Sequence, residues 1–143
     1  MSPRRLDPSI VEARLVAMTT LLDDLAGFDV DLERDAMSRY ATERVLTQLV
    51  ELAASINEHV AGAVLGRAAT SYRDSVVVAC EVGMIDADLR DDLLPSVGMR
   101  NVLVHEYVRV DLARVAAAVP LALDVYRRYI ASAAAFVVER GEQ

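Results

Sequence analysis

The sequence predicts an all-α fold, an antiparallel up-and-down bundle of about five helices formed by a single domain over residues 1–143. Hydrophobic residues make up 54% of the chain but aromatic residues only 5%, so the apolar content is mostly Ala, Val and Leu, which suits closely packed helices. Apolar residues recur at three- and four-residue steps, as on one face of a helix, and no stretch of useful length alternates like a strand. A chain of this length can bury one compact core.

The first two helices follow from their capping residues and apolar stripes. Residues 8–26 are expected to form the first helix, because Asp7 or Ser9 can cap its N-terminus, Pro8 suits its first turn and Gly27 can end it. Apolar residues between positions 37 and 56 then recur at helical spacing. This pattern predicts the longest helix over about residues 32–60, and His59 is expected to interact with the dipole of its last turn.

Turn residues separate the remaining three helices. Gly62 and Gly66 are expected to flank a loop, after which residues 70–82 form a short helix with Gly83 as its stop. A fourth helix begins near residues 85–88 and is expected to bend at Pro95, because proline removes a backbone hydrogen bond. Asp111 caps the fifth helix, which ends near residues 139–141.

The charge and cysteine content narrow the possible functions. A formal net charge of −7 counts against general nucleic-acid binding, although Arg100 and Arg109 can still form a local basic site. Cys80 is the only cysteine, which excludes an intramolecular disulfide and a cysteine-based metal site in one chain; in its apolar surroundings it is expected to be buried. We find no apolar stretch typical of a secretory signal or membrane span, so a cytoplasmic protein without membrane contact is expected.

The stretch from Arg100 to Tyr107, with the sequence RNVLVHEY, groups more reactive side chains than any other segment. On a helix, Asn101 and His105 share one face and can hydrogen-bond. Arg100 and His105 differ by roughly 140° around an ideal helix. Both can therefore meet one ligand only through the reach of the arginine, a frayed helix end or a second copy of the segment. We expect a homodimer.

This stretch resembles the R-x4-H-x-Y signature of HEPN-domain proteins, and most closely that of the HepT-like toxins of HepT/MNT toxin–antitoxin pairs. The family's other landmarks are matched in order, and together they cover most of the chain: residues 40–46, Glu51, residues 71–74, residues 83–85 and residues 100–111. The resemblance implies a helical, dimeric endoribonuclease in which Arg100 and His105 line a groove between subunits. It also implies an MNT-type nucleotidyltransferase antitoxin that transfers AMP to Tyr107.

The residue types fit metal-independent RNA cleavage, which needs a base, an acid and a cation beside the phosphate. His105 can act as base or acid because an unperturbed imidazole titrates near pH 6.5. Arg100 is always charged and can stabilise the phosphorane, and Asn101 can hold the imidazole or contact phosphate. The toxin itself is expected to need no cofactor, since ATP and Mg²⁺ would belong to the antitoxin.

Each of these residues also has a structural interpretation. His105 can simply close the helix end, Arg100 can pair with Glu106 or Asp92, and Asn101 can be a local cap. Tyr107 can bind a base or phosphate, accept AMP or be a half-buried tyrosine. Glu51 and Arg44 share a helix face and either support the signature or lie on a solvated surface.

A second function is compatible with the sequence. The chain can be a non-catalytic helical subunit of a nucleotidyltransferase complex whose signature holds a nucleotide, and the acidic charge and few aromatic residues fit this hypothesis as well. Cleavage of RNA would separate the two.

Overall fold

Five helices and no strands form the part of the chain that the computed structural model describes, which is residues 5–28, 32, 35–105 and 110–141. The helices are α1 (Pro8–Ala26), α2 (Ala36–Val64), α3 (Tyr72–Glu81), α4 (Ala87–His105) and α5 (Leu112–Gly141). The predicted all-α fold is confirmed, and α1 has the predicted limits. The predicted limits of the second helix were wrong at both ends: Asp35 caps it, so it begins at Ala36, and Gly62 lies inside it.

Short polar side chains set the helix starts. The Asp7 carboxylate accepts from the backbone N–H of Ser9 at 3.0 Å, and the Asp35 carboxylate accepts from that of Met37 at 3.0 Å. Each carboxylate also accepts a hydroxyl hydrogen bond, from Ser9 and Ser38 respectively, and these hydroxyls are the largest cause that lowers the pKa of both aspartates. The ionised carboxylates thus complete the unpaired first turns of α1 and α2.

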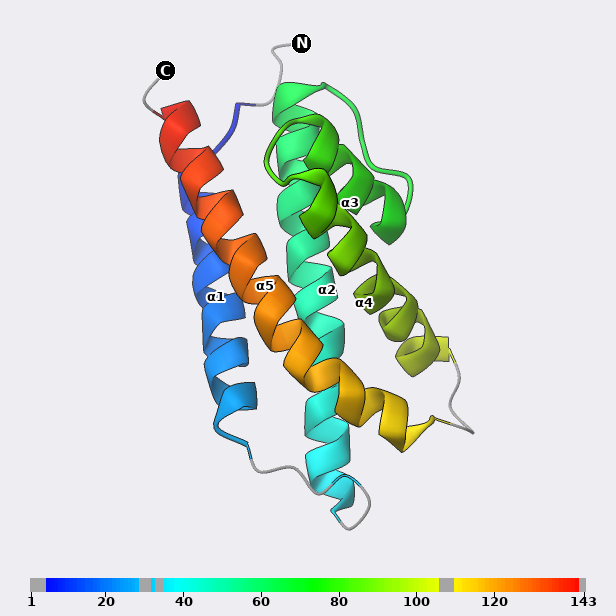
Figure 1. Ribbon diagram of the computed structural model, residues 1–143. Helices are drawn as coiled ribbons and strands as arrows, with labels where there is room; N and C mark the ends of the chain where they lie inside the picture. Colours follow the sequence, from blue (N-terminus) through cyan, green and yellow to red (C-terminus); the bar gives the residue numbers. More distant parts are fainter. Residues whose placement is uncertain (1–4, 29–31, 33–34, 106–109, 142–143) are drawn as a thin grey trace.

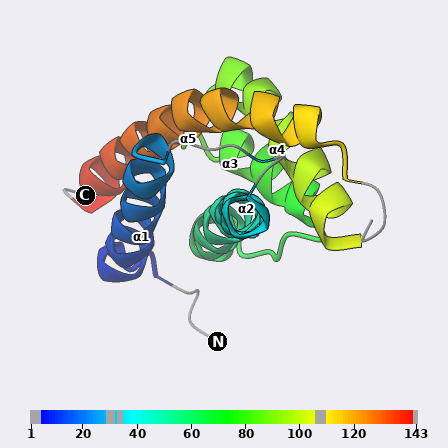
Figure 2. The same ribbon diagram turned by 90° about the horizontal axis from the view of Figure 1, so that it is seen from below.

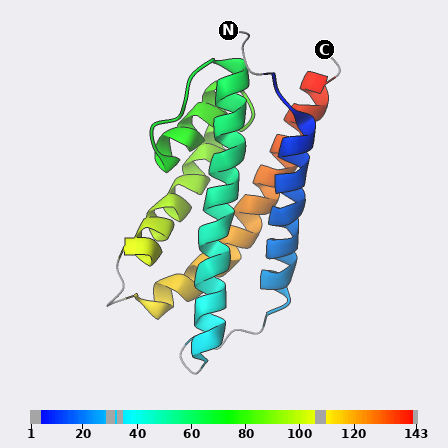
Figure 3. The same cartoon turned by 180° about the vertical axis from the view of Figure 1, so that it is seen from behind.

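Helix α2 is the central element of the bundle. It contacts the other four helices, with α1 on one side, α3 and α4 on the other, and α5 crossing it (Figures 1 and 3). Helices α1 and α4 run in one direction and α2 and α5 in the other, and α5 crosses the bundle obliquely (Figures 1 and 2). The end of α4 at His105 therefore lies at the same end of the bundle as the start of α5.

Two buried tyrosines of α5 connect it to its neighbours. The Tyr129 hydroxyl lies 2.6 Å from Asn57 Oδ1 and 3.2 Å from the Ala53 carbonyl oxygen, both on α2. The Tyr126 hydroxyl lies 2.6 Å from Ser96 Oγ on α4. Burial raises the pKa of both phenols, which therefore stay protonated at neutral pH.

Helix α4 continues through Pro95 as one helix to His105, so Arg100 belongs to the same helix as Leu89. Leu89, Leu93 and Val97 are the buried residues of α4 and lie on its core-facing side. In the ranges given above, every helix is too short or too polar to cross a lipid bilayer.

Candidate active site

The signature residues that the structure describes all lie in the last part of α4. His105 is its final residue and is exposed, and Asn101 is exposed one turn earlier. Arg100 follows Leu93 and Val97 at seven- and three-residue steps and so lies on the face of α4 that packs against the bundle. Tyr107 and Arg109 lie outside the described residues, as does Glu106.

Arg100 is held by residues of two other helices. Its guanidinium carbon lies 4.3 Å from the centre of the Tyr72 ring, at the start of α3. Its Nη2 atom lies 3.5 Å from the Tyr72 hydroxyl and 3.8 Å from a carboxylate oxygen of Glu51 on α2, and only 15% of the side chain is exposed. Its Nη1 atom donates to Asn101 Oδ1 at 3.3 Å. The arginine is thus mostly buried between α2, α3 and α4.

These contacts bear on the partners considered from sequence. Glu51 lies beside Arg100, the Asp92 carboxylate accepts from Arg128 at 2.6 Å, and Glu106 lies outside the described residues. Glu51 therefore does contact the signature, and Arg44 on the same helix is exposed. Sequence reasoning missed Tyr72 as a neighbour of Arg100. The only signal was that Tyr72 belongs to a family landmark, and no spacing rule connects positions 72 and 100.

One chain does not bring Arg100 and His105 together. The helix is regular through His105, so the predicted divergence of about 140° holds, and Arg100 faces Tyr72 and Glu51. Within the described ranges no hydrogen bond joins His105 to Arg100 or to Asn101, whose amide oxygen accepts from Arg100 instead. Among the described residues, the two side chains therefore diverge on a helix that continues to His105.

A groove of about 510 Å³ runs between α4 and α5, beside the signature. Its lining includes the apolar residues Pro95, Met99, Leu121, Ala122 and Val125. Leu121 is 65% exposed. The charged residues of the lining are Asp91, Asp92, Asp124, Arg114 and Arg128.

Two residues considered from sequence have structural surroundings that differ from the prediction. The predicted dipole contact of His59 was wrong, because α2 continues to Val64 and the His59 Nε2 atom accepts from the Asp7 backbone N–H at 2.9 Å. Cys80 is only partly buried, and its sulfur lies 3.8 Å from Arg90 Nη1. Among the residues that the structure describes, no three His, Cys, Asp or Glu side chains gather as metal ligands would.

The sequence profile described as ribonuclease HepT-like matches residues 17–133. The chain belongs to the HepT-like ribonuclease family. The resemblance seen in the signature and the expected ribonuclease class are both confirmed by this match.

Relatives of this HepT-like chain agree in length and fold. The tRNA nuclease HepT of Aphanizomenon flos-aquae (strain 2012/KM1/D3) is 28% identical over 143 residues, which span 96% of this chain and 97% of the relative. The tri-AMPylated HEPN toxin of Shewanella oneidensis, solved with its MNT antitoxin, superposes with a TM-score of 0.77 at 21% identity and covers 86% of this chain and 95% of its own.

A third similar protein, YutE of Bacillus subtilis, is described as cytosolic and of unknown function. It superposes with a TM-score of 0.84 at 16% identity, covering 94% of this chain and 93% of its own. At these identities the two solved structures show that the HepT-like chain has the HEPN fold.

Proposed function

We propose that this chain is the toxin of a toxin–antitoxin pair, a metal-independent endoribonuclease that cleaves RNA with Arg100 and His105 at a cleft between two copies. The observation that carries the proposal is the placement of Arg100: it is mostly buried against Tyr72 and Glu51, while His105 is exposed on the same helix of a HepT-like ribonuclease. A buried charge is costly unless it is paired, and the carboxylate beside Arg100 is 3.8 Å away, so an anion such as a phosphate would still be attracted to it. Transfer RNA is the first substrate to test, because a relative is a tRNA nuclease.

The proposed reaction needs only groups that the chain and the RNA supply. One imidazole of His105 accepts the proton of the ribose 2′-hydroxyl, whose oxygen attacks the adjacent phosphorus. The bond from phosphorus to the 5′ oxygen breaks, and that oxygen takes a proton from the second His105, in its protonated form. Arg100 stabilises the charge on the phosphorane oxygens. The products are a 2′,3′-cyclic phosphate and a 5′-hydroxyl, and Asn101 supports Arg100.

We propose that the second copy binds in the groove between α4 and α5. The apolar lining of the groove, rather than its charges, favours this contact, because Asp92 and Asp124 already pair with Arg128 at 2.6 Å and 3.3 Å and Asp91 pairs with Arg90 at 3.0 Å. A two-fold contact across the groove would place Leu121 of each copy against the apolar lining of the other, as an isologous interface requires. The exposed Leu121 would then be buried.

The proposed antitoxin is an MNT-type nucleotidyltransferase that uses ATP and Mg²⁺ to transfer AMP to Tyr107. A Shewanella oneidensis protein of the same fold is itself tri-AMPylated and bound to an MNT antitoxin. AMP on a phenol two residues after His105 adds negative charge and bulk where RNA phosphate must bind, which disfavours the substrate. Mass spectrometry of the chain co-expressed with such an antitoxin should show AMP additions that Tyr107→Phe prevents.

The decisive test is cleavage of total RNA and transfer RNA by protein whose mass shows that it is unmodified, in excess EDTA. The parent should cleave, and His105→Ala and Arg100→Ala should each lose at least about 100-fold in rate. The matched controls are His59→Ala and Arg127→Ala, which remove the same side-chain types at the contacts with Asp7 and Asp23. Cleavage that stops in EDTA, or that survives both signature substitutions, would overturn the proposal. No cleavage by the parent, with intact antitoxin binding, favours the non-catalytic subunit.

Mixed dimers test whether the site takes groups from both copies. When equal amounts of the parent and inactive His105→Ala proteins are unfolded together and refolded, about a quarter of the dimers are pure parent and about half are mixed. Because the proposed cleft needs the imidazoles of both copies, only the pure parent dimers should cleave, and the mixture should show about a quarter of the activity of the same total amount of parent. About half of that activity would mean that each chain uses its own pair. Leu121→Asp should shift the parent from dimer to monomer in light scattering.

A further inference from the structure

We propose that Tyr72 and Glu51 are positioning residues for Arg100, which hold its guanidinium in the orientation that a phosphate needs. The inference rests on the proposed function of Arg100, and it assigns roles to two residues that lie 28 and 49 positions before it in the chain. Neither residue would touch the reacting atoms. Each would act by limiting the orientations of the arginine before RNA binds.

The contact with Tyr72 fixes the plane of the guanidinium. The guanidinium carbon lies 4.3 Å from the ring centre, a distance typical of a stacked cation–π pair, and the side chain is 15% exposed. A long arginine otherwise loses considerable rotamer entropy when it is ordered on a ligand. Stacking on a ring that is already ordered removes that cost from the binding step, which is the usual benefit of preorganisation.

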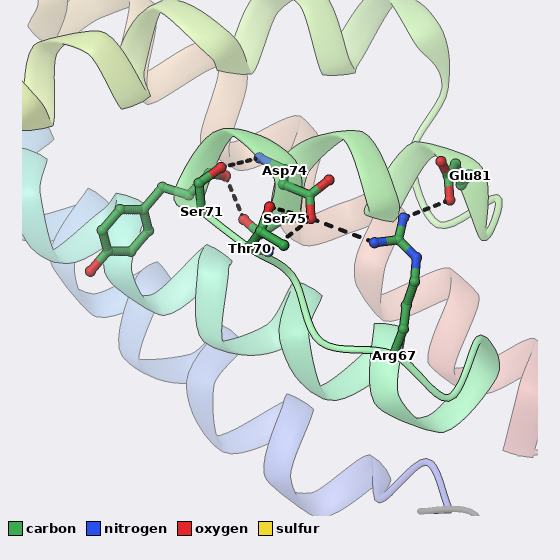
Figure 4. A network of polar contacts seen from close by, with 7 residues as sticks. Arg67, Thr70, Ser71, Asp74, Ser75 and Glu81 are labelled. Atoms are coloured by element: carbon green, nitrogen blue, oxygen red, sulfur yellow. Dashed lines mark hydrogen bonds and ion pairs between the residues drawn. The ribbon is translucent and has the colours of Figure 1, made fainter.

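Tyr72 itself is anchored by the polar network at the start of α3 (Figure 4). The Ser71 hydroxyl accepts from the Asp74 backbone N–H at 2.9 Å and caps the helix. The buried Ser75 hydroxyl donates to the Tyr72 carbonyl at 2.6 Å. The Asp74 carboxylate accepts from the Thr70 backbone N–H at 2.9 Å, which is the largest cause that lowers its pKa. The backbone that carries the tyrosine is thus fixed on both sides.

Arg67 adds two ion pairs to this network. It lies 3.5 Å from the Asp74 carboxylate and 3.1 Å from that of Glu81 (Figure 4). It therefore links the loop after α2 to both ends of α3, so the ring of Tyr72 is presented to α4 from an ordered helix start.

Glu51 partly neutralises the charge of Arg100 without occupying all of its N–H donors. Its carboxylate oxygen lies 3.8 Å from Nη2, and the other polar contacts of the guanidinium are 3.3 Å and 3.5 Å long. Strong charge-assisted hydrogen bonds are shorter, about 2.7–2.9 Å. The buried Nε atom of Arg100 has no hydrogen-bond partner among the described residues. A guanidinium carries five N–H donors, so donors remain for a phosphate.

The test compares the cleavage of one transfer RNA by the parent, Tyr72→Phe, Tyr72→Leu and Glu51→Gln, all in EDTA. Tyr72→Phe keeps the ring and should stay within about 3-fold of the parent, while Tyr72→Leu should lose about 10-fold or more in kcat/KM. Glu51→Gln should fall between them. Arg140→Leu is the control, because it removes an arginine–ring contact of 5.0 Å at the far end of the bundle.

A double substitution distinguishes positioning from a general effect on the fold. In an Arg100→Lys background, which keeps a charge but not the planar group, Tyr72→Leu should cause less than about 3-fold further loss, because the two residues act through one another. A folded Tyr72→Leu protein with the parent rate overturns the inference. An equal fold-loss in kcat/KM from Tyr72→Leu in the parent and in the Arg100→Lys protein overturns it as well.

A spectroscopic measurement keeps the inference testable even when RNA cleavage is absent. In nuclear magnetic resonance spectra, the two Nη groups of a held guanidinium give separate ¹⁵N signals, because rotation about the Nε–Cζ bond is slow. Arg100 should show such signals in the parent and in Tyr72→Phe, and they should merge in Tyr72→Leu. Separate signals in all three proteins refute the positioning role, whereas inactivity of the parent refutes only the proposed function.

Discussion

The buried hydrogen bond between Tyr129 and Asn57 allows a quantitative prediction of how much one core contact contributes to the free energy of unfolding. Both side chains are almost completely buried, and the hydroxyl lies 2.6 Å from the amide oxygen. The amide nitrogen of Asn57 already has no partner in the part of the chain that the structure describes. Tyr129→Phe therefore leaves a whole buried amide without a side-chain partner, which costs about 1–3 kcal/mol of unfolding free energy.

This cost converts to a measurable shift in melting temperature. A chain of 143 residues has an unfolding entropy of about 0.3 kcal/mol/K, so a loss near 2 kcal/mol lowers Tm by about 7 °C. Calorimetry and urea unfolding at one fixed protein concentration should agree on the loss. Tyr40→Phe is the control: Tyr40 is 54% exposed, and the change should stay within about 0.5 kcal/mol.

The double variant provides the sharper test. Tyr129→Phe with Asn57→Leu removes both polar groups, so no buried amide is left to desolvate, and it should be at least about 1 kcal/mol more stable than Tyr129→Phe alone. Strictly additive losses would refute the reasoning, since they would mean that the two side chains do not depend on one another. A Tyr129→Phe protein as stable as the parent would refute it as well.

Three further predictions concern stability. Burial raises the pKa of Tyr126 and Tyr129 above the value near 10 of an unfolded tyrosine. The contribution of each phenol to the free energy of unfolding is therefore complete below about pH 10 and falls above it by up to about 1.4 kcal/mol per pH unit. Urea unfolding midpoints measured from pH 8.5 to 11 should show this decline, and Tyr126→Phe should make it less steep. Gly83 has φ of +82°, so Gly83→Ala should lower the free energy of unfolding by about 1 kcal/mol in the same assay. Gly98 lies in α4 with no atom within 4 Å of an added Cβ, so Gly98→Ala should raise it by up to about 1 kcal/mol. Changes of the same sign in the two variants would contradict this prediction. Ser71→Ala removes the cap of α3 and should cost about 1 kcal/mol, which an unchanged Tm would disprove.

The helix that carries the candidate site could be predicted because its determinants are local. The relative directions of Arg100, Asn101 and His105 follow from helix geometry, and the structure keeps the regular helix that this argument needs. The limits of α2 were harder, because Asp35 was not recognised as its cap and Gly62 and Gly66 were expected to flank a loop. Asp35 decided its start, and Gly62 lies inside a helix that tertiary packing stabilises.

Local sequence by itself determined the all-α class, the limits of α1, the cap at Asp111, and the segment that carries Arg100 and His105, while the structure chose Asp7 over Ser9 as the cap of α1. These features depend on hydrogen bonds and periodicity within a few residues. Only the tertiary structure decided that Glu51 and Tyr72 lie beside Arg100. Such contacts depend on how α2, α3 and α4 pack around one core, and no spacing along the chain encodes which side chains then meet.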